Sequence, residues 1–531
     1  MKLAQLYHTL RHCRREQLLG QAVYRLRGHR PPSRGVSPAF PGCRLDPGWQ
    51  PPVPLTGLNT ASSMCDGRFS FVNLEAQAGW PPGWQAEDMP MLWRYNLHYL
   101  DGIWALELGE ARELARDWMA KNPLAEGGIG WDPYPVSLRL VNLCLYFFQR
   151  HREAVLADVS FRDGLWESLY AHAHWLQKNL EIRLLGNHLL ENLVALEVFA
   201  CFFKDQDNPA HDRLQRELDE QILPDGMHFE RSPMYHLRVV YLLEILAGIG
   251  SDCVKDLLEP ARQAAARLQH PDGEIALFND AAFNVYPTVT RSEEQGAWSL
   301  PDAGYYGWRD AEANYLVCDA GPIGPDYIPG HAHADMLSFE WSICGKRFIV
   351  DSGVYDYVPG EMRDYCRSTA AHNTVEINAA DQCECWGAFR VARRGYPTVD
   401  EWKPVDTGFS LSASHDGYAR LHRSLRHRRG FSWQAPGRLT ITDEVASTSP
   451  VRAVARFHLH PDWQIEHLDG LCATLRREQL SVTLRIVGEG VLGRERSWYC
   501  PEFYRRVEND CLVFTSSGPG QWTTTFELQA T

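Results

Sequence analysis

The sequence predicts an α+β multidomain protein in which an N-terminal (α/α) toroid or helical solenoid is followed by a C-terminal antiparallel β-sandwich. Between about residues 90 and 270, apolar residues recur at the i, i+3, i+4 spacing of amphipathic helices. After about residue 300 the spacing changes to the alternation typical of strands, with turn residues between the runs. A chain of 531 residues is also too long for one hydrophobic core, so we expect separate domains.

The chain divides into three predicted segments. Residues 1–60 hold an N-terminal helix and a connector that is rich in proline and glycine. Residues 61–300 form the predicted toroid domain, and residues 301–531 form the predicted sandwich domain. Apolar periodicity predicts helices over residues 102–120, 136–150, 164–179, 188–203, 211–222, 233–249 and 253–269.

Strands are expected throughout the last segment. Their apolar and β-branched runs lie between turn residues, which favours a mostly antiparallel arrangement. An all-α region followed by an all-β region predicts a binding cleft between two domains. The expected strands cover residues 313–319, 336–343, 346–350, 374–377, 438–443, 454–460, 480–486, 512–515 and 523–528.

Composition and charge limit the classes of function. The formal net charge of −14 argues against nucleic acid as the main partner, although a locally basic cleft can still bind an anionic substrate. The chain has no apolar run long enough to span a membrane and no apolar core of a secretory signal near Met1. We therefore expect a cytoplasmic protein, with a periplasmic location left open. The 14 cysteines are scattered, which favours free thiols over a disulfide framework.

The densest group of candidate functional residues begins with His331 and His333, which are followed by Asp351 and His372. On an extended segment, two histidines two residues apart point the same way because the strand period is two. A carboxylate and a third histidine further along can close on them. This set predicts a zinc site with histidine and aspartate ligands, with one histidine left for proton chemistry.

Two predicted helix starts bring further polar residues together. Asn187 and His188 open one apolar helix, and Tyr235 opens another behind Ser232 as N-cap and Pro233 at the first helical position. One helix separates them, so both starts lie at the same end of an up-and-down toroid. An asparagine amide there can hold the charge of a substrate carboxylate while a phenolate or imidazole removes a proton.

Simpler roles remain open for these residues. Asn187 can serve as a helix cap, and His188 can serve in packing. The reference pKa of a tyrosine is near 10, so Tyr235 is a poor base unless its neighbours lower that value. Residues 93–99 and 131–139 place aromatic rings beside arginines, which suits a chain of acidic sugars but also suits a protein core.

These segments together resemble the heparinase II/III-like polysaccharide lyase family. The similarity runs in one order from about residue 90 to about residue 380 and is specific for the superfamily, not for a substrate. Weaker similarity continues into the C-terminal strands. The matching segments are residues 95–99, 186–192, 232–235, 331–335, 350–353 and 371–375.

The resemblance implies an incomplete (α/α) toroid, an antiparallel β-sandwich, and β-elimination on a uronic-acid polysaccharide. In that reaction a base removes the proton at C5 of the uronate, and the C4–O bond breaks. By position, Asn187 neutralises the carboxylate with His188 beside it, while Tyr235 and His331 exchange protons with the substrate. We assign further substrate contacts to Arg94, Tyr95, Asn96, His98, Trp131, Arg139 and Arg231.

Related lyases also imply a zinc ion in the β-domain with a mainly structural role. Its ligands map to His333, Asp351 and His372, and Asp335 is expected to accept a hydrogen bond from a histidine. Two rival functions remain. One is a glycan-binding protein of the same fold that has lost elimination; the other is a zinc-dependent glycan hydrolase.

Overall fold

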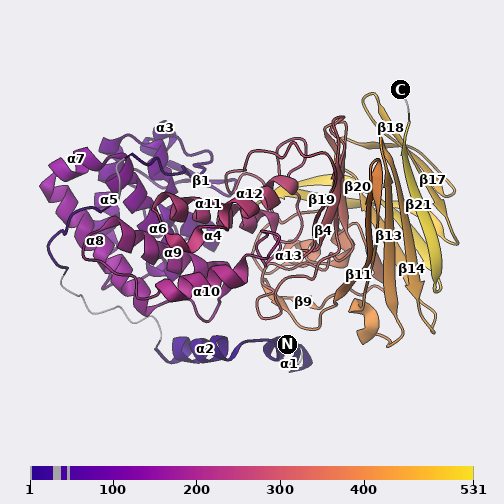
Figure 1. The fold of residues 1–531 in the computed structure, drawn as a ribbon, viewed down its shortest axis with the longest axis horizontal. Helices are drawn as coiled ribbons and strands as arrows, with labels where there is room; N and C mark the ends of the chain where they lie inside the picture. The colour runs from indigo at the N-terminus through magenta and orange to yellow at the C-terminus, as the bar shows by residue number, and fades with distance from the viewer. Residues whose placement is uncertain (1–2, 28–36, 45–47, 530–531) are drawn as a thin grey trace.

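The computed structural model describes residues 3–27, 37–44 and 48–529, so parts of the predicted 31–60 connector lie outside the described residues. Helices gather at one end of the molecule and β-sheets at the other (Figure 1). The prediction of an N-terminal helical domain followed by antiparallel sheets is confirmed. The closure of the helices into an incomplete toroid stays a prediction, as do the three segment boundaries.

The helical domain is built around two buried helices, α9 (Gly186–Phe202) and α11 (Pro233–Gly248). Both are apolar on all sides, which is typical of helices in the centre of a domain. A π-helical segment, Cys144–Arg150, continues α6. The surrounding elements are α3 (Ala61–Cys65), β1 (Arg68–Phe71), β2 (Leu74–Gln77), α4 (Met91–Tyr99), α5 (Leu108–Lys121), α6 (Pro133–Leu143), α7 (Arg152–Ala157), α8 (Val159–Lys178), α10 (His211–Gln221) and α12 (Leu258–Arg267).

The β-domain has an inner layer and an outer layer. The inner layer joins a five-stranded sheet to a four-stranded one through a bridge between Ile349 and Leu459. The five-stranded sheet contains β3 (Gly296–Leu300), β4 (Tyr305–Arg309), β5 (Tyr315–Asp319), β6 (Phe339–Ile343) and β7 (Lys346–Ile349). The four-stranded sheet, in the order β19-β20-β15-β8, contains β19 (Val491–Glu502), β20 (Arg505–Ser517), β15 (Arg452–His458) and β8 (Val375–Ile377).

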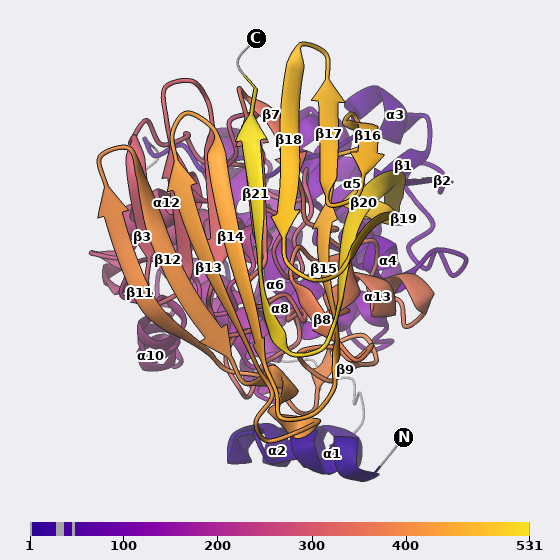
Figure 2. The ribbon, with the colours of Figure 1, turned by 90° about the vertical axis from the view of Figure 1, so that its right-hand side faces the viewer.

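An eight-stranded antiparallel sheet forms the outer layer (Figure 2). Its inward side chains, such as Phe431 and Phe526, pack on those of the inner layer, such as Phe339 and Trp341. In sheet order, the strands are β11 (Pro397–Val405), β12 (Gly408–His415), β13 (Arg426–Gln434), β14 (Arg438–Ala446), β21 (Gly520–Leu528), β18 (Leu480–Val487), β17 (Cys472–Arg477) and β16 (Gln464–Asp469).

The two domains meet across an apolar interface. The inner sheet packs Trp298 and Tyr305 against Met227 and Phe278 from the helical side. Short elements between the domains include β9 (Cys385–Trp386), β10 (Arg390–Val391) and α13 (Glu361–Cys366). This interface fixes the position of loops from both domains relative to one another.

The N-terminal segment forms two helices, α1 (Leu3–Leu10) and α2 (Arg15–Arg27), where the sequence predicted one. Figure 1 shows them running beneath both domains. The hydroxyl of Thr9 donates to the carbonyl oxygen of Val391, next to β9, and Arg14 forms an ion pair with Glu220 on the helical side. The amide of Gln17 donates to the carbonyl oxygen of Tyr327 between them, at 3.0 Å.

The fourteen cysteines, all of which lie in the described part of the chain, are free thiols. This agrees with the sequence-based expectation. Within the described residues, no helix combines the length and the apolar character needed to cross a membrane.

Candidate active site

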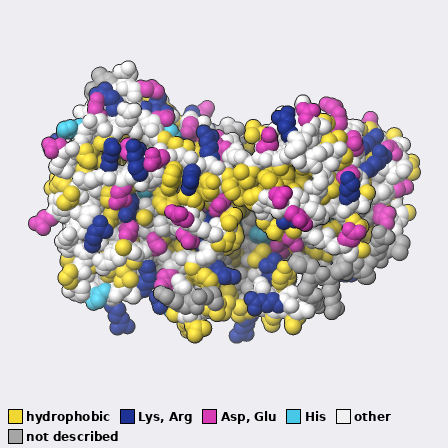
Figure 3. All heavy atoms as spheres, turned by 180° about the vertical axis from the view of Figure 1, so that it is seen from behind, with side chains coloured by type: hydrophobic (Ala, Val, Ile, Leu, Met, Phe, Trp, Pro, Cys, Tyr) yellow, Lys and Arg dark blue, Asp and Glu magenta, His cyan; other side chains and the backbone are white. Residues whose placement is uncertain are grey.

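A cavity of about 1880 Å³ lies between the helical domain and the β-domain. Hydrophobic side chains gather where the two lobes of the molecule meet (Figure 3). The four residues predicted to be catalytic, Asn187, His188, Tyr235 and His331, all line this cavity. The four residues grouped from the sequence therefore also lie together in the fold.

Tyr235 is positioned by the start of α11. The hydroxyl of Ser232 accepts a hydrogen bond from the backbone N–H of Tyr235 at 3.2 Å, and Pro233 occupies the first helical position, as predicted. The Tyr235 hydroxyl lies 3.0 Å from the hydroxyl of Tyr357. Burial, together with Tyr357, raises the pKa of Tyr235 well above its ordinary value, so this phenol holds its proton.

His331 lies on a loop that precedes β6, and not on the extended strand that the sequence predicted. Its ring stacks on Tyr235 with centroids 3.9 Å apart. The strand expected over residues 336–343 forms as β6 from Phe339 onward, after a turn in which Leu337 has a positive φ of 63°, so the extended segment expected for His331 and His333 does not form. The two histidines nevertheless reach the same group, since the loop carries both of them to Asp280.

Asp280 is the functional residue that the sequence did not reveal. Its carboxylate lies 2.9 Å from Nδ1 of His331 and 3.0 Å from Nε2 of His333, and both its oxygens also accept from Arg363. Burial alone would raise the pKa of Asp280, but Arg363 and the two histidine bonds hold it well below its usual range. The only signal in the sequence is an acid two positions after the apolar run 275–278.

The charge of Asp280 decides which nitrogen of each histidine carries a proton. An ionised carboxylate can only accept, so each histidine donates from the nitrogen that faces it. Nε2 of His331, which lies 3.6 Å from the Glu230 carboxylate, and Nδ1 of His333 then hold the lone pairs when the rings are neutral. The lone pair of His331 lies at the cavity wall, and the lone pair of His333 lies on the buried side of the loop.

Asn187 lies in the first turn of α9 and is not the helix cap, because the N-cap position belongs to Leu185. Its backbone N–H donates to Glu230 at 2.9 Å. Gly186 has a φ of 55°, and a Cβ there would lie 2.5 Å from the Glu230 carboxylate, so this approach requires glycine. Among the described residues, the Asn187 side-chain amide has no hydrogen-bond partner, which leaves it available to a ligand in the cavity.

His188 stands beside Asn187 and carries a raised pKa. Its Nδ1 lies 3.2 Å from Glu181, and its ring packs on Tyr134 with centroids 4.6 Å apart. Burial alone would lower the pKa of His188, but the Glu181 carboxylate outweighs burial and raises it. His188 thus places positive charge next to Asn187 below that pKa.

The predicted substrate contacts divide into two groups. Tyr95 and Asn96 line the cavity. The other five are not in the cavity wall and form side-chain hydrogen bonds within the protein, so their contact with a substrate stays a prediction. Those residues are Arg94 (to Gln85), His98 (to Trp84 and Trp118), Trp131 (to Asn122), Arg139 (to His98, Gly130 and His172) and Arg231 (to Phe229, Asp302 and Ala303).

Other cationic side chains line the cavity in their place. Arg183 lies over the ring of Tyr24 at 4.3 Å, and Arg390 lies over the ring of Trp386 at 4.7 Å. Stacked guanidinium groups of this kind are pre-organised for carboxylates or sulfates.

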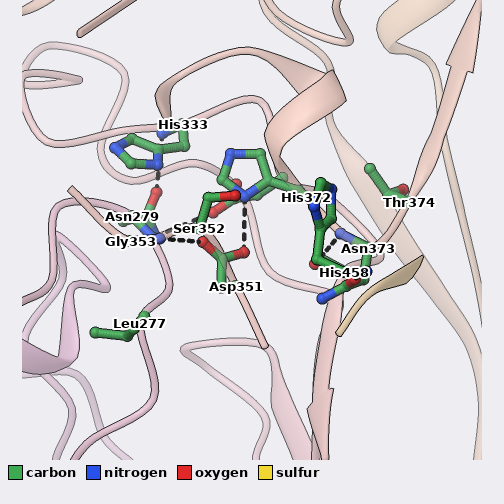
Figure 4. Close-up of polar contacts among 12 residues, drawn as sticks. Leu277, Asn279, His333, Asp351, Ser352, Gly353, His372, Asn373, Thr374 and His458 are labelled. Atoms are coloured by element: carbon green, nitrogen blue, oxygen red, sulfur yellow. Dashed lines mark hydrogen bonds and ion pairs between the residues drawn. The ribbon is translucent and has the colours of Figure 1, made fainter. Parts of the chain in front are cut away.

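The predicted metal ligands converge on the buried side of the His331 loop (Figure 4). Candidate ligand atoms of His333, Asp335 and His372 all lie within 4.8 Å of one another. Asp351 accepts from Nδ1 of His372 at 2.7 Å. Asp335, expected only as a hydrogen-bond acceptor, therefore joins the candidate ligands, and Asp351 lies directly beside them.

The donor set fits a cation such as zinc. Nδ1 of His333 and Nε2 of His372 are buried without a hydrogen-bond partner among the described residues. An unpaired imidazole nitrogen in a buried place is costly unless something binds it. Two imidazole nitrogens beside carboxylates match the ligand preference of zinc.

Comparisons with known proteins follow the same division of the chain. A sequence model described as heparinase II/III N-terminus matches residues 112–303, and one described as heparinase II/III-like, C-terminal, matches residues 293–525. The chain belongs to the heparinase II/III-like family. Within this family, a heparin-sulfate lyase of Bacteroides stercoris is 22% identical over 513 residues, covering 80% of this chain and 72% of that protein.

A second relative, the heparin-sulfate lyase of Pedobacter heparinus, is 26% identical over 320 residues, covering 49% of this chain and 47% of that protein. Solved structures of the heparinase II/III-like family share the fold. A crystal structure of heparinase III aligns with a TM-score of 0.71 at 15% identity, over 97% of this chain and 92% of that chain. The heparan sulfate lyase of Pedobacter heparinus aligns with a TM-score of 0.60 at 18% identity, over 97% and 87%.

Proposed function

We propose that this protein is a polysaccharide lyase that cleaves a uronate-containing anionic glycan by β-elimination. The observation that carries the proposal is the convergence of Asn187, Tyr235 and His331 on one cavity, with His331 held by the buried Asp280. Membership of the heparinase II/III-like family and relatives named heparin-sulfate lyase support the same reaction class.

The first requirement of elimination is to acidify C5 of the uronate. The C5 proton is only weakly acidic because its removal adds negative charge to a neighbouring carboxylate that is already ionised. In our proposal the Asn187 amide donates to that carboxylate and the His188 imidazolium lies beside it. Donors aimed at developing charge in a buried site contribute to the rate more than donors in water do.

His331 is the proposed base. Because Nδ1 of His331 donates to Asp280, Nε2 presents its lone pair, and this nitrogen takes the C5 proton. Asp280 then stabilises the imidazolium that forms, as a carboxylate does behind a catalytic histidine. Asp280 does not touch the substrate, so it is a positioning residue.

Tyr235 is the proposed acid. A phenol whose pKa is raised keeps its proton and can give it to the C4 oxygen as the C4–O bond breaks. The electron pair from the C5–H bond forms the C4=C5 double bond, and the pair from the C4–O bond leaves with the released sugar. Return of a proton from solvent to Tyr235 and loss of one from His331 to solvent restore the starting state.

We also propose that zinc binds at His333 and His372 with Asp335 and Asp351. When bound, it would brace the loop that carries His331, because His333 lies two residues further along the same loop. The chain's own residues carry each proton step, so the proposed role of zinc is structural.

The test is ultraviolet absorbance of the unsaturated uronate, followed over a panel of acidic polysaccharides with wild type and His331→Ala. We expect absorbance to rise with the wild type and to vanish in the variant. Products without a double bond would indicate a hydrolase, and binding without cleavage on every glycan would indicate a glycan-binding protein. Either result would reject elimination.

A further inference from the structure

A second group of metal-binding side chains lies in the helical domain, outside the cavity. Glu197 lies on α9, His211 is the first residue of α10, and Cys253 lies in a short 3-10 helix, Asp252–Val254, after α11. Candidate ligand atoms of these three residues all lie within 4.8 Å of one another. Glu197 and Cys253 are buried, while the His211 ring is 40% exposed, so the site can be reached from solvent.

The distances between these side chains match the edges of a tetrahedral site. Nδ1 of His211 lies 3.2 Å from both oxygens of Glu197 and 3.9 Å from Sγ of Cys253. Zinc bonds of about 2.3 Å to sulfur and about 2.0 Å to nitrogen or oxygen imply edges of about 3.5 Å to sulfur and about 3.3 Å between nitrogen and oxygen. Small side-chain shifts are enough to close the shell.

A further thiol lies beside Glu197 on the same helix, outside the group of three whose ligand atoms are all close to one another. Cys201 lies one turn after Glu197 on α9, and its Sγ is 3.9 Å from Oε1 of Glu197. Outside these groups, Asn208 and Ser251 donate to the Glu197 carboxylate at 2.8 and 3.1 Å. Partners of this kind fix the orientation of a ligating carboxylate.

The chemistry of the set selects the metal. One imidazole, one carboxylate and two thiols combine borderline and soft ligands, which favour zinc over magnesium or calcium. On binding, each thiol loses its proton to solvent as the sulfur–zinc bond forms.

We propose that Glu197, His211 and Cys253 bind one zinc ion, with Cys201 as the fourth ligand, and that this ion ties α9, α10 and the turn after α11 together. Its role is structural. The last turn of helix α10 contains Glu220, whose carboxylate accepts from Arg14, directly before α2, and from Tyr327. The ion therefore steadies the helix that anchors the N-terminal segment.

Cobalt substitution tests this site separately from the β-domain site. The full chain is stripped of metal and titrated with Co²⁺, and the thiolate-to-cobalt absorption band is recorded in the near ultraviolet. The β-domain cluster contains no cysteine, so this band reports only the proposed site. We expect the band in wild type and in His333→Ala, a weaker band in Cys253→Ser, and its loss when Cys201 and Cys253 are both changed to Ser.

Two further variants complete the experiment: one changes a partly exposed ligand, and the other changes a cysteine outside the proposed site as a control. His211→Gln changes an exposed ring, so the protein should fold, and we expect it to bind one equivalent of zinc less than wild type by elemental analysis. Cys65→Ser, at an exposed cysteine, should retain the band and the zinc. Folded wild type that gives no thiolate band, or His211→Gln with unchanged zinc content, would overturn the proposal.

Discussion

The rings of Tyr235 and His331 lie 3.9 Å apart at an angle of 31°, and the two residues come from different domains. Tyr235 begins a helix of the first domain, and His331 lies on a loop of the second. The proposed acid and base therefore meet only when the domain interface is formed. The reaction geometry depends on the apolar contact between the two domains as much as on the two rings.

Tyr235→Phe should lower turnover by about 10²–10⁴-fold, because it removes the donated proton while keeping the ring that packs on His331. The matched control is Tyr357→Phe, which removes the partner hydroxyl and should cost far less. A substrate with a good leaving group at C4 needs no proton donor. Such a substrate should restore Tyr235→Phe but not His331→Ala; restoration of both variants would contradict the assignment of acid and base.

Asn187→Ala should lower kcat more than it raises KM, because the amide acts on charge that develops during the reaction. By comparison with other donors to developing charge, a loss of about 10²-fold in kcat is expected. A uronate methyl ester carries no charge to neutralise, so wild type and variant should differ much less on it. An equal deficit on acid and ester would remove Asn187 from this role.

The binding of an anionic glycan should weaken as the pH rises. The pKa of His188 is raised above 6.5 because Glu181 outweighs burial and Arg183, so the imidazolium is present below that raised pKa and is lost above it. KM should increase as pH passes through this value. In Glu181→Gln, burial alone governs the pKa of His188 and lowers it, so the increase in KM should move to lower pH. An unchanged dependence of KM on pH would exclude His188 from binding.

The ion pair of His188 and Glu181 also stabilises the folded state, and this contribution likewise decreases as the pH rises. His188 gains a partner on folding, so its contribution is complete below pH 6.5 and is lost as the pH rises through the raised value. Urea unfolding of wild type and Glu181→Gln across this range should diverge at low pH and converge at high pH.

Asp280→Asn should destabilise the fold by about 3–5 kcal/mol, because the buried Arg363 loses its carboxylate partner. Urea unfolding measures the change. Glu294→Gln breaks an exposed pair with Arg267 and should change the free energy of unfolding by less than about 1 kcal/mol. Equal effects in the two variants would show that Asp280 does not organise the site.

His333→Ala should reduce zinc bound in the β-domain and lower the melting temperature together. His458→Gln provides the control, since His458 lies close by and both its ring nitrogens bond to other groups, Ala370 and Ser497 (Figure 4). Elemental analysis should find less zinc in the first variant only. Unchanged zinc in His333→Ala would reject this ligand.

Local sequence signals predicted the parts of the fold that depend on local chemistry. The Ser232 cap and Pro233 located α11, and apolar alternation located β5, β7 and β18. Strands such as β13 were missed because charged residues occupy their exposed face, as at Arg426 and Arg428. Their burial alternates residue by residue, but the apolar side is short and interrupted.

The site was predicted where its residues form motifs and missed where they do not. Asp280 lies 51 positions before His331, and no spacing rule connects the two. Trp131 and Arg139 were assigned to the cleft because aromatic and basic residues occur together there. The fold uses them inside the helical domain, and a sequence alone cannot distinguish a buried guanidinium from a cleft guanidinium.

The N-terminal segment with its two helices is attached to both domains and connects them. Thr9 of α1 is attached to the β-domain, and Arg14, between α1 and α2, is attached to α10, so rotation of one domain against the other would break both attachments. Side chains of α1 and α2 also form part of the cavity wall. In the proposed function, these side chains, remote from the proton-transfer residues, would contact the glycan at the cleft, so removal of the N-terminal helices should alter glycan binding and leave the proton-transfer residues in place.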